Sequence, residues 1–122
     1  MERAATEKNQ HLLSTLGLCK RAGGLVIGTP MVCEAMKDKK KGVLAVLEAE
    51  NTSDNTHDKL TSKCAYYSVP HYRIPVTTEA LGHTVGKTGA VAAVGVTHAG
   101  LFRALQKHLP EASITAPAEP NS

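Results

Sequence analysis

Apolar residues first recur at helical spacing, three or four positions apart, and then form short continuous runs. Leu12, Leu16 and Cys19 follow the helical period, which stops at Gly23-Gly24. The pattern predicts a first helix over residues 9–22. The apolar run at 25–27 then predicts a short strand.

A second helix is predicted from Thr29 to about Lys40. Thr29 is expected to cap it, and Pro30 suits its first position, where a backbone N–H would have no partner. Val32, Ala35 and Met36 should form the inner face. The burst of lysines that follows would then lie at the carboxyl end of this helix.

The rest of the chain continues to alternate strands and helices. We expect a strand buried on both faces at 43–47, a polar connection at 48–55, a helix with inward residues Leu60, Cys64 and Tyr67, and a strand at 71–74. Thr77 or Thr78 should cap a short helix through Gly82. A strand at 90–96 and a helix at 98–109 complete the pattern, which predicts an α/β domain with a small sheet covered on both faces.

The 122 residues suffice for one domain but not for two. We predict a flexible N-terminus at 1–8, a folded domain at 9–109, and a disordered tail at 110–122, which holds three of the six prolines. No apolar run approaches the roughly 20 residues that span a bilayer, and the first residues lack the apolar core of a signal peptide. A cytoplasmic location without a membrane partner is therefore expected.

Charge is unevenly distributed. The net charge is +3, yet residues 8–109 hold 13 Lys or Arg against 7 Asp or Glu, so that segment carries +6. A basic domain favours a polyanionic partner, although charge also serves solubility. The lysines at 37, 39, 40 and 41 fit either a solvated helix end or a phosphate-binding cluster.

Other kinds of site are disfavoured by spacing. Residues 86–89, Gly-Lys-Thr-Gly, lack the first glycine of a phosphate-binding loop at the required distance and lead into a strand rather than a helix. The six histidines never take the spacing that places two metal ligands on one helix face. Cys19, Cys33 and Cys64 are predicted to be buried free thiols. We therefore expect no catalytic residue, metal or cofactor.

Three segments in order resemble the L7Ae and L30e family of ribosomal proteins, especially its small bacterial members. They are "LLSTLGLCKRAGGLVIGTPMVCEAMK", "LAVLEAENTSDNTHDKLTSKCAYYSVPHY" and "TEALGHTVGKTGAVAAVGVT". The likeness covers residues 12–109, and its most specific pieces are Ala22-Gly23 leading to Gly28, residues 58–70, and Leu81-Gly82 through Gly86-Lys87. The resemblance implies a three-layer α/β/α sandwich with a small mixed sheet. It also implies binding to structured RNA, classically a kink-turn.

The resemblance also assigns candidate RNA-binding residues. Helices of kink-turn binders present Asn-Glu and then a Lys to sheared G·A pairs, and those positions match Pro30, Met31 and Glu34 here. Base-edge contacts are therefore lost, and we predict weak or absent kink-turn affinity. The full candidate set is Gly28, Thr29, Pro30, Met31, Glu34, Lys37, Val85, Gly86 and Lys87.

Three functions remain open. The first is a non-enzymatic protein that binds ribosomal or other non-coding RNA, on the ribosome or elsewhere, with DNA not expected. The second is a protein-interaction module of the same fold, in which Pro30 and Met31 form an apolar contact. The third, the substrate-binding domain of an enzyme, ranks last.

Overall fold

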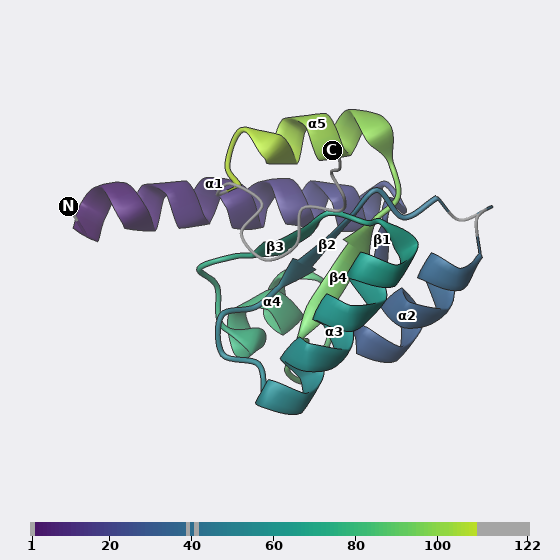
Figure 1. The fold of residues 1–122 in the computed structure, drawn as a ribbon. Helices are drawn as coiled ribbons and strands as arrows, with labels where there is room; N and C mark the ends of the chain where they lie inside the picture. The colour runs from purple at the N-terminus through teal and green to yellow at the C-terminus, as the bar shows by residue number, and fades with distance from the viewer. Residues whose placement is uncertain (1, 39, 41, 110–122) are drawn as a thin grey trace, which may run out of the picture.

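The computed structural model describes residues 2–38, 40 and 42–109 as five helices and four strands (Figure 1). The predicted tail at 110–122 lies outside this range. The elements in order are α1 (Glu2–Arg21), β1 (Leu25–Ile27), α2 (Thr29–Lys37), β2 (Ala45–Glu48), α3 (Asp54–Tyr67), β3 (His71–Arg73), α4 (Thr78–Thr84), β4 (Ala93–Val96) and α5 (Ala99–Gln106).

The strands form one mixed sheet in the order β1-β4-β2-β3. β4 is antiparallel to both neighbours, with Ile27 opposite Val94 and Glu48 opposite Ala93, whereas β2 and β3 are parallel. The carboxyl ends of β1, β2 and β3 therefore meet the amino end of β4 at one end of the sheet.

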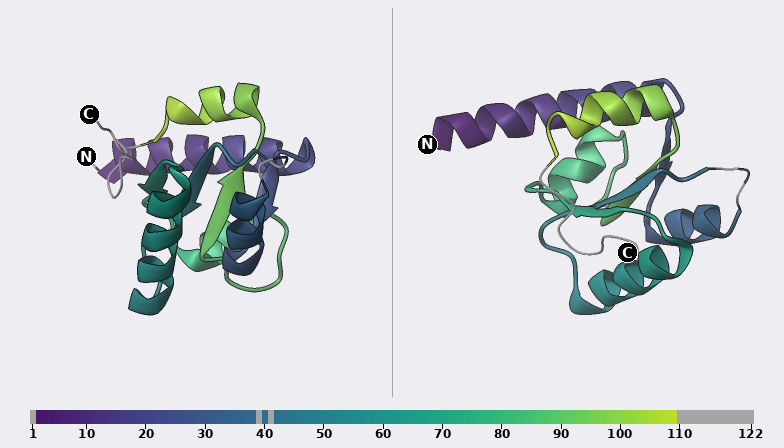
Figure 2. Two further views of the ribbon diagram at one scale, coloured as in Figure 1. Left: turned by 45° about the vertical axis from the view of Figure 1, so that its right-hand side comes forward. Right: turned by 45° about the horizontal axis from the view of Figure 1, so that its top comes forward.

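Helices cover both faces of this sheet. α1, α4 and α5 lie on one face, and α2 and α3 lie side by side on the other (Figures 1 and 2). Successive strand residues point to opposite layers: Val46 joins the cluster under α2 and α3, and Leu47 joins the cluster under α1, α4 and α5. The predicted three-layer α/β/α sandwich with a small mixed sheet is confirmed.

Helix boundaries differ from the sequence expectation at the start of α1 and at the ends of α2, α4 and α5. α4 ends at Thr84 rather than Gly82, and α5 ends at Gln106 rather than Leu109. α1 begins at Glu2 rather than near Asn9, because residues 2–8 are mostly good helix formers without Gly or Pro. α2 ends at Lys37 rather than near Lys40, since its C-cap, Asp38, already has an extended backbone.

Of the two predicted helix N-caps, one is wrong and one is confirmed. The N-cap of α2 is Gly28, so the prediction that Thr29 caps this helix is wrong. Thr77 does cap α4, where its side chain accepts a hydrogen bond from the Ala80 amide.

All three cysteines are free thiols and buried, as predicted. Burial raises the pKa of Cys19. Burial, with smaller contributions from Cys33 and Glu48, raises the pKa of Cys64 to about 12. Both thiols are thereby held in the protonated, unreactive form.

Candidate nucleic-acid interface

The loops at the carboxyl ends of β1, β2 and β3 and the loop before β4 form a continuous edge. We call residues 28–31, 49–53, 74–77 and 85–92 the loop edge. It contains most of the residues that the sequence singled out, although Glu34 and Lys37 lie further along α2.

The start of α2 is tied to β4 by its glycine. Gly28 has φ 94° and ψ 144°, a conformation that side chains disfavour, and its amide donates to the Ala93 carbonyl at 2.9 Å. No side chain caps the helix. The first amides of a helix have no partner within it, so this turn offers donors and partial positive charge at the surface.

Side chains around this turn are mainly apolar. Pro30 and Met31 are exposed, and Met31 has 55% of its surface accessible. The Thr29 hydroxyl is buried and has no hydrogen-bond partner among the described residues. The turn therefore combines backbone donors with an apolar surface.

Glu34 and Lys37 form an exposed ion pair, with 3.3 Å between the Glu34 Oε2 and Lys37 Nζ atoms. Such surface pairs add little stability, but each partner offsets the other's charge. Lys37 is therefore a weaker attraction for phosphate than an unpaired lysine would be. Lys39 and Lys41 lie outside the described residues.

The loop before β4 presents glycine and lysine at the surface. Gly86 and Lys87 are exposed, and the Lys87 amide donates to the Gly82 carbonyl at 2.9 Å. An open hollow of about 380 Å³ lies beside them, lined by Glu79, His83, Lys87, Thr88, Gly89 and Ala90. No ion pair involves Lys87 in the part of the chain that the structure describes.

Val85 differs from its neighbours in this loop. Its side chain is completely buried and packs in the core under α1, α4 and α5. A residue without exposed surface cannot contact RNA, so the assignment of Val85 to direct binding is corrected: it anchors the loop that carries Gly86 and Lys87.

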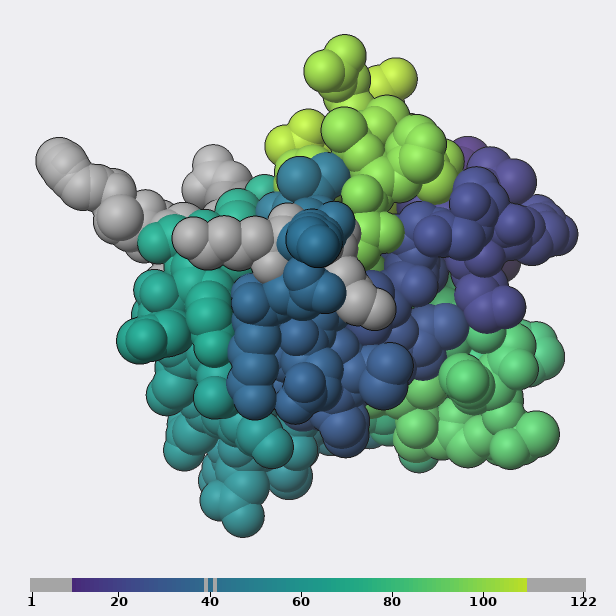
Figure 3. Space-filling model, turned by 90° about the vertical axis from the view of Figure 1, so that its right-hand side faces the viewer, coloured from purple at the N-terminus to yellow at the C-terminus, as the bar shows by residue number. Residues whose placement is uncertain are grey.

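The two predicted halves of the interface lie next to each other. In Figure 3 the blue surface of α2 borders the green surface of the segment before β4, as the Gly28–Ala93 hydrogen bond requires. The left view of Figure 2 shows the same neighbourhood. The structure thus places the segment that starts α2 beside the segment before β4, which contains Gly86 and Lys87.

Residues 49–53, which the sequence assigned only to a polar connection, complete the edge. The Ala49 amide donates to Ala92 at 2.8 Å, and the Glu50 amide donates to Val76 at 2.9 Å. Asn51 Oδ1 accepts from the Thr78 amide at 2.8 Å. These bonds hold the loop after β2 against both the β4 loop and the start of α4.

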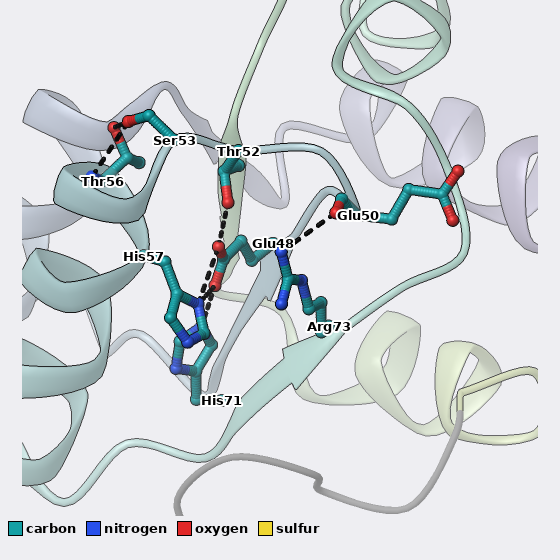
Figure 4. A network of polar contacts seen from close by, with 8 residues as sticks. All are labelled: Glu48, Glu50, Thr52, Ser53, Thr56, His57, His71 and Arg73. Atoms are coloured by element: carbon teal, nitrogen blue, oxygen red, sulfur yellow. Dashed lines mark hydrogen bonds and ion pairs between the residues drawn. The ribbon is translucent and has the colours of Figure 1, made fainter.

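A buried carboxylate lies directly behind this loop. Glu48 ends β2 and is fully buried, so its placement in a polar connection is wrong. Its Oε1 atom is 2.8 Å from His71 Nε2, and His57 Nδ1 lies 3.0 Å from both carboxylate oxygens (Figure 4). The Thr52 hydroxyl donates to Oε2. We call Glu48, Thr52, His57 and His71 the carboxylate cluster.

Hydrogen bonds determine the ionisation of Glu48. Burial alone would raise the pKa of this carboxyl group, but the hydrogen bonds from His71, Thr52 and His57 outweigh that effect and lower the pKa to about 2. Glu48 is therefore an anion across the neutral range. The sequence contains one signal for its burial: Glu48 continues the apolar run of β2 without an intervening turn residue.

The described residues contain no group of three or more His, Cys, Asp or Glu side chains able to hold a metal ion. Within the same part of the chain, no helix has the length and apolar character needed to cross a membrane.

Comparisons with known proteins agree with this architecture. The model of the "Ribosomal protein L7Ae/L30e/S12e/Gadd45 family" matches residues 10–106. The RNA-binding protein YlxQ of Bacillus subtilis (strain 168) is 36% identical over 90 residues, which cover 74% of this chain and 86% of that protein. A protein of the same name from Enterococcus faecium is 31% identical over 65 residues, which cover 53% of this chain and 61% of its own length.

Solved structures show the same fold. A protein of unknown function from Bacillus halodurans C superimposes with a TM-score of 0.70 and 31% identity, covering 80% of this chain and 94% of that one. The Giardia lamblia 15.5kD RNA binding protein gives a TM-score of 0.63 at 19% identity, with 84% of each chain covered. At that identity the second likeness concerns the fold alone.

Proposed function

Since this chain belongs to the ribosomal protein L7Ae/L30e/S12e/Gadd45 family, we propose that it is a non-enzymatic protein that binds structured RNA through the loop edge. The observation that supports the proposal is the hydrogen bond from Gly28 to Ala93, which joins the open start of α2 to the strand that follows the loop containing Gly86 and Lys87. The relatives named as RNA-binding proteins support it.

Each half of the loop edge supplies a different contribution to RNA binding. The first amides of α2 and the Lys87 ammonium favour phosphate oxygens, which fix the position of a protein on RNA without reading its sequence. Gly28 and Gly86 let the RNA backbone approach closely. The candidate contacts are thus Gly28, Thr29, Pro30, Met31, Gly86 and Lys87, with Glu34 and Lys37 at the margin.

Kink-turn recognition is not part of this proposal. Sheared G·A pairs are read by hydrogen-bonding side chains, whereas Pro30 and Met31 can offer only apolar contact and Glu34 is paired with Lys37. We propose that the RNA partner is a folded ribosomal or other non-coding RNA in the cytoplasm, bound on the ribosome or apart from it.

Fluorescence anisotropy with three labelled RNAs tests the proposal: a standard kink-turn, a duplex with an internal loop, and a plain duplex. We expect affinity for a folded RNA that falls steeply with salt, because phosphate contacts release counterions. Weak kink-turn binding is also expected. Absence of binding to any folded RNA at low salt would contradict the proposal.

The exposed Met31 also supports an alternative, a protein-interaction module of the same fold. Affinity capture of a protein partner whose binding is insensitive to salt and lost in a Met31→Ser variant would favour that alternative.

A further inference from the structure

We propose that Glu48 is a positioning residue for RNA binding: through Thr52 and His57 it holds the 49–53 loop, and through that loop the RNA-facing end of the β4 loop. This inference rests on the proposed function. Glu48 itself is fully buried and cannot touch RNA, so its effect must pass through the residues that it binds.

The carboxylate is held by groups from three separate segments. His71 approaches from β3, His57 from the first turn of α3, and Thr52 from the loop between β2 and α3 (Figure 4). Within the described residues, these three side chains are the ones that bind the Glu48 carboxylate. The loop at 49–53 is thus held to the carboxylate at two points: by Thr52 within the loop and by His57 near the start of α3.

Donor roles within the carboxylate cluster follow from the available partners. An ionised carboxylate only accepts, so Thr52 donates its hydroxyl hydrogen, and each histidine donates the hydrogen on its facing nitrogen. His71 Nδ1 is buried and has no partner among the described residues, so a hydrogen on that atom would lack an acceptor. His71 is therefore assigned the tautomer with hydrogen on Nε2.

Hydrogen bonds connect the 49–53 loop to the residues that we propose face the RNA. Ala49 and Asn51 bond to Ala92 and Thr78, respectively, as described above, and the Arg73 side chain donates to the Glu50 carbonyl at 3.0 Å. Ala92 ends the segment that contains Lys87 and precedes Ala93, the partner of Gly28. Loss of the Thr52 or His57 contact should therefore loosen the loop edge where its parts join.

Thr52→Val is the central test, because it removes one hydroxyl and preserves side-chain shape. Thr61→Val is its matched control, since the buried Thr61 hydroxyl has no partner among the described residues. His57→Gln provides a second test, with a substitution of the exposed His11 of α1, His11→Gln, as its control. Glu48→Gln is measured as well, although this substitution at a fully buried position can also lower the stability of the whole protein.

Two readouts are needed: RNA affinity and amide hydrogen exchange of the RNA-free protein. We expect Thr52→Val and His57→Gln to weaken RNA binding by about threefold or more, and to accelerate exchange at Ala49 and Glu50 by at least about fivefold. Exchange in α1 and α5 should stay unchanged, which distinguishes local positioning from general destabilisation. Both controls should match the parent protein in both readouts.

The outcomes separate this inference from the proposed function. If the parent protein binds no RNA, the proposed function fails, while the exchange data still test the link between Glu48 and the loop. If RNA is bound but Thr52→Val and His57→Gln change neither affinity nor local exchange, the positioning role of Glu48 is overturned and the proposed function stands. Uniform acceleration of exchange across the protein would also overturn it.

Discussion

The start of α2 and the loop before β4 lie side by side on the loop edge, yet they offer different chemistry. The α2 turn presents backbone donors and the apolar side chains of Pro30 and Met31, and its nearest charges are paired with each other. The β4 loop presents exposed Gly86 and Lys87 without an ion-pair partner for Lys87 among the described residues. Under the proposed function, the β4 loop supplies attraction for phosphate, whereas Pro30 and Met31 of the α2 turn offer no hydrogen bonds to base edges.

This difference separates two parts of RNA recognition. Phosphate contacts supply affinity and salt dependence, whereas base-edge contacts supply sequence specificity. A scaffold can therefore keep its RNA-facing backbone while three side chains redirect its specificity.

Acid should remove the stability that the ionised Glu48 carboxylate contributes behind the loop edge. The pKa of Glu48 is about 2 in the folded protein and 4.5 in a model compound. Its ionisation stabilises the fold fully above pH 4.5, and this contribution, about 3 kcal/mol, is lost as pH falls from 4.5 toward 2. Urea unfolding at pH 6 and pH 3 should show a smaller pH-dependent loss for Glu48→Gln than for the parent. Equal losses would show that Glu48 is not the responsible group.

Gly82→Ala should damage the β4 loop and leave the α2 turn in place. A Cβ at this position would lie 2.0 Å from the Gly89 carbonyl oxygen, so the loop must shift. We expect a loss of about 2 kcal/mol in unfolding free energy, as for other overpacked sites. Calorimetry measures it, and Gly89→Ala, where a Cβ meets no atom within 4 Å, is the control. Equal stability of Gly82→Ala and the parent would contradict the observed close approach.

The triple change Pro30→Asn, Met31→Glu and Glu34→Lys should restore base reading at the α2 turn. It rebuilds polar contacts and reverses one charge, and we expect kink-turn affinity to rise at least about tenfold, or about 1.4 kcal/mol. Anisotropy with a standard kink-turn measures the change, and a plain duplex controls for added charge. A folded triple variant without any gain, or nanomolar kink-turn binding by the parent, would refute our account of these positions.

Lys87→Gln should weaken RNA binding more than Lys37→Gln, because only Lys37 is paired with a carboxylate. For Lys87→Gln we expect about a threefold loss of affinity and a salt slope lower by about 1, since one phosphate contact disappears. Lys37→Gln should change affinity by less than about twofold. A larger loss of affinity for Lys37→Gln than for Lys87→Gln would show that the main phosphate contact lies on α2 and not on the β4 loop.

Residues that obey local rules could be located from the sequence, and those held by distant partners could not. Thr77 caps α4 by accepting a hydrogen bond from Ala80, only three residues away. The apolar run at 25–27 and the glycine that follows it likewise located the start of α2. The histidine partners of Glu48 lie 9 and 23 positions along the chain, on α3 and on the parallel strand β3, so only the folded sheet brings them together. Val85 lies four positions after the buried Leu81, the spacing of one helix face, but the predicted helix ended at Gly82, so this signal for its burial was missed.

Ultraviolet crosslinking of the bound RNA, followed by mass spectrometric identification of the modified peptides, locates the RNA-binding surface directly. We expect crosslinks in residues 28–31 and 86–90, on the two neighbouring halves of the loop edge, and their loss at high salt. Crosslinks confined to α1 and α5, or to the exposed Tyr66 at the far end of α3, would show that RNA binds elsewhere on the molecule.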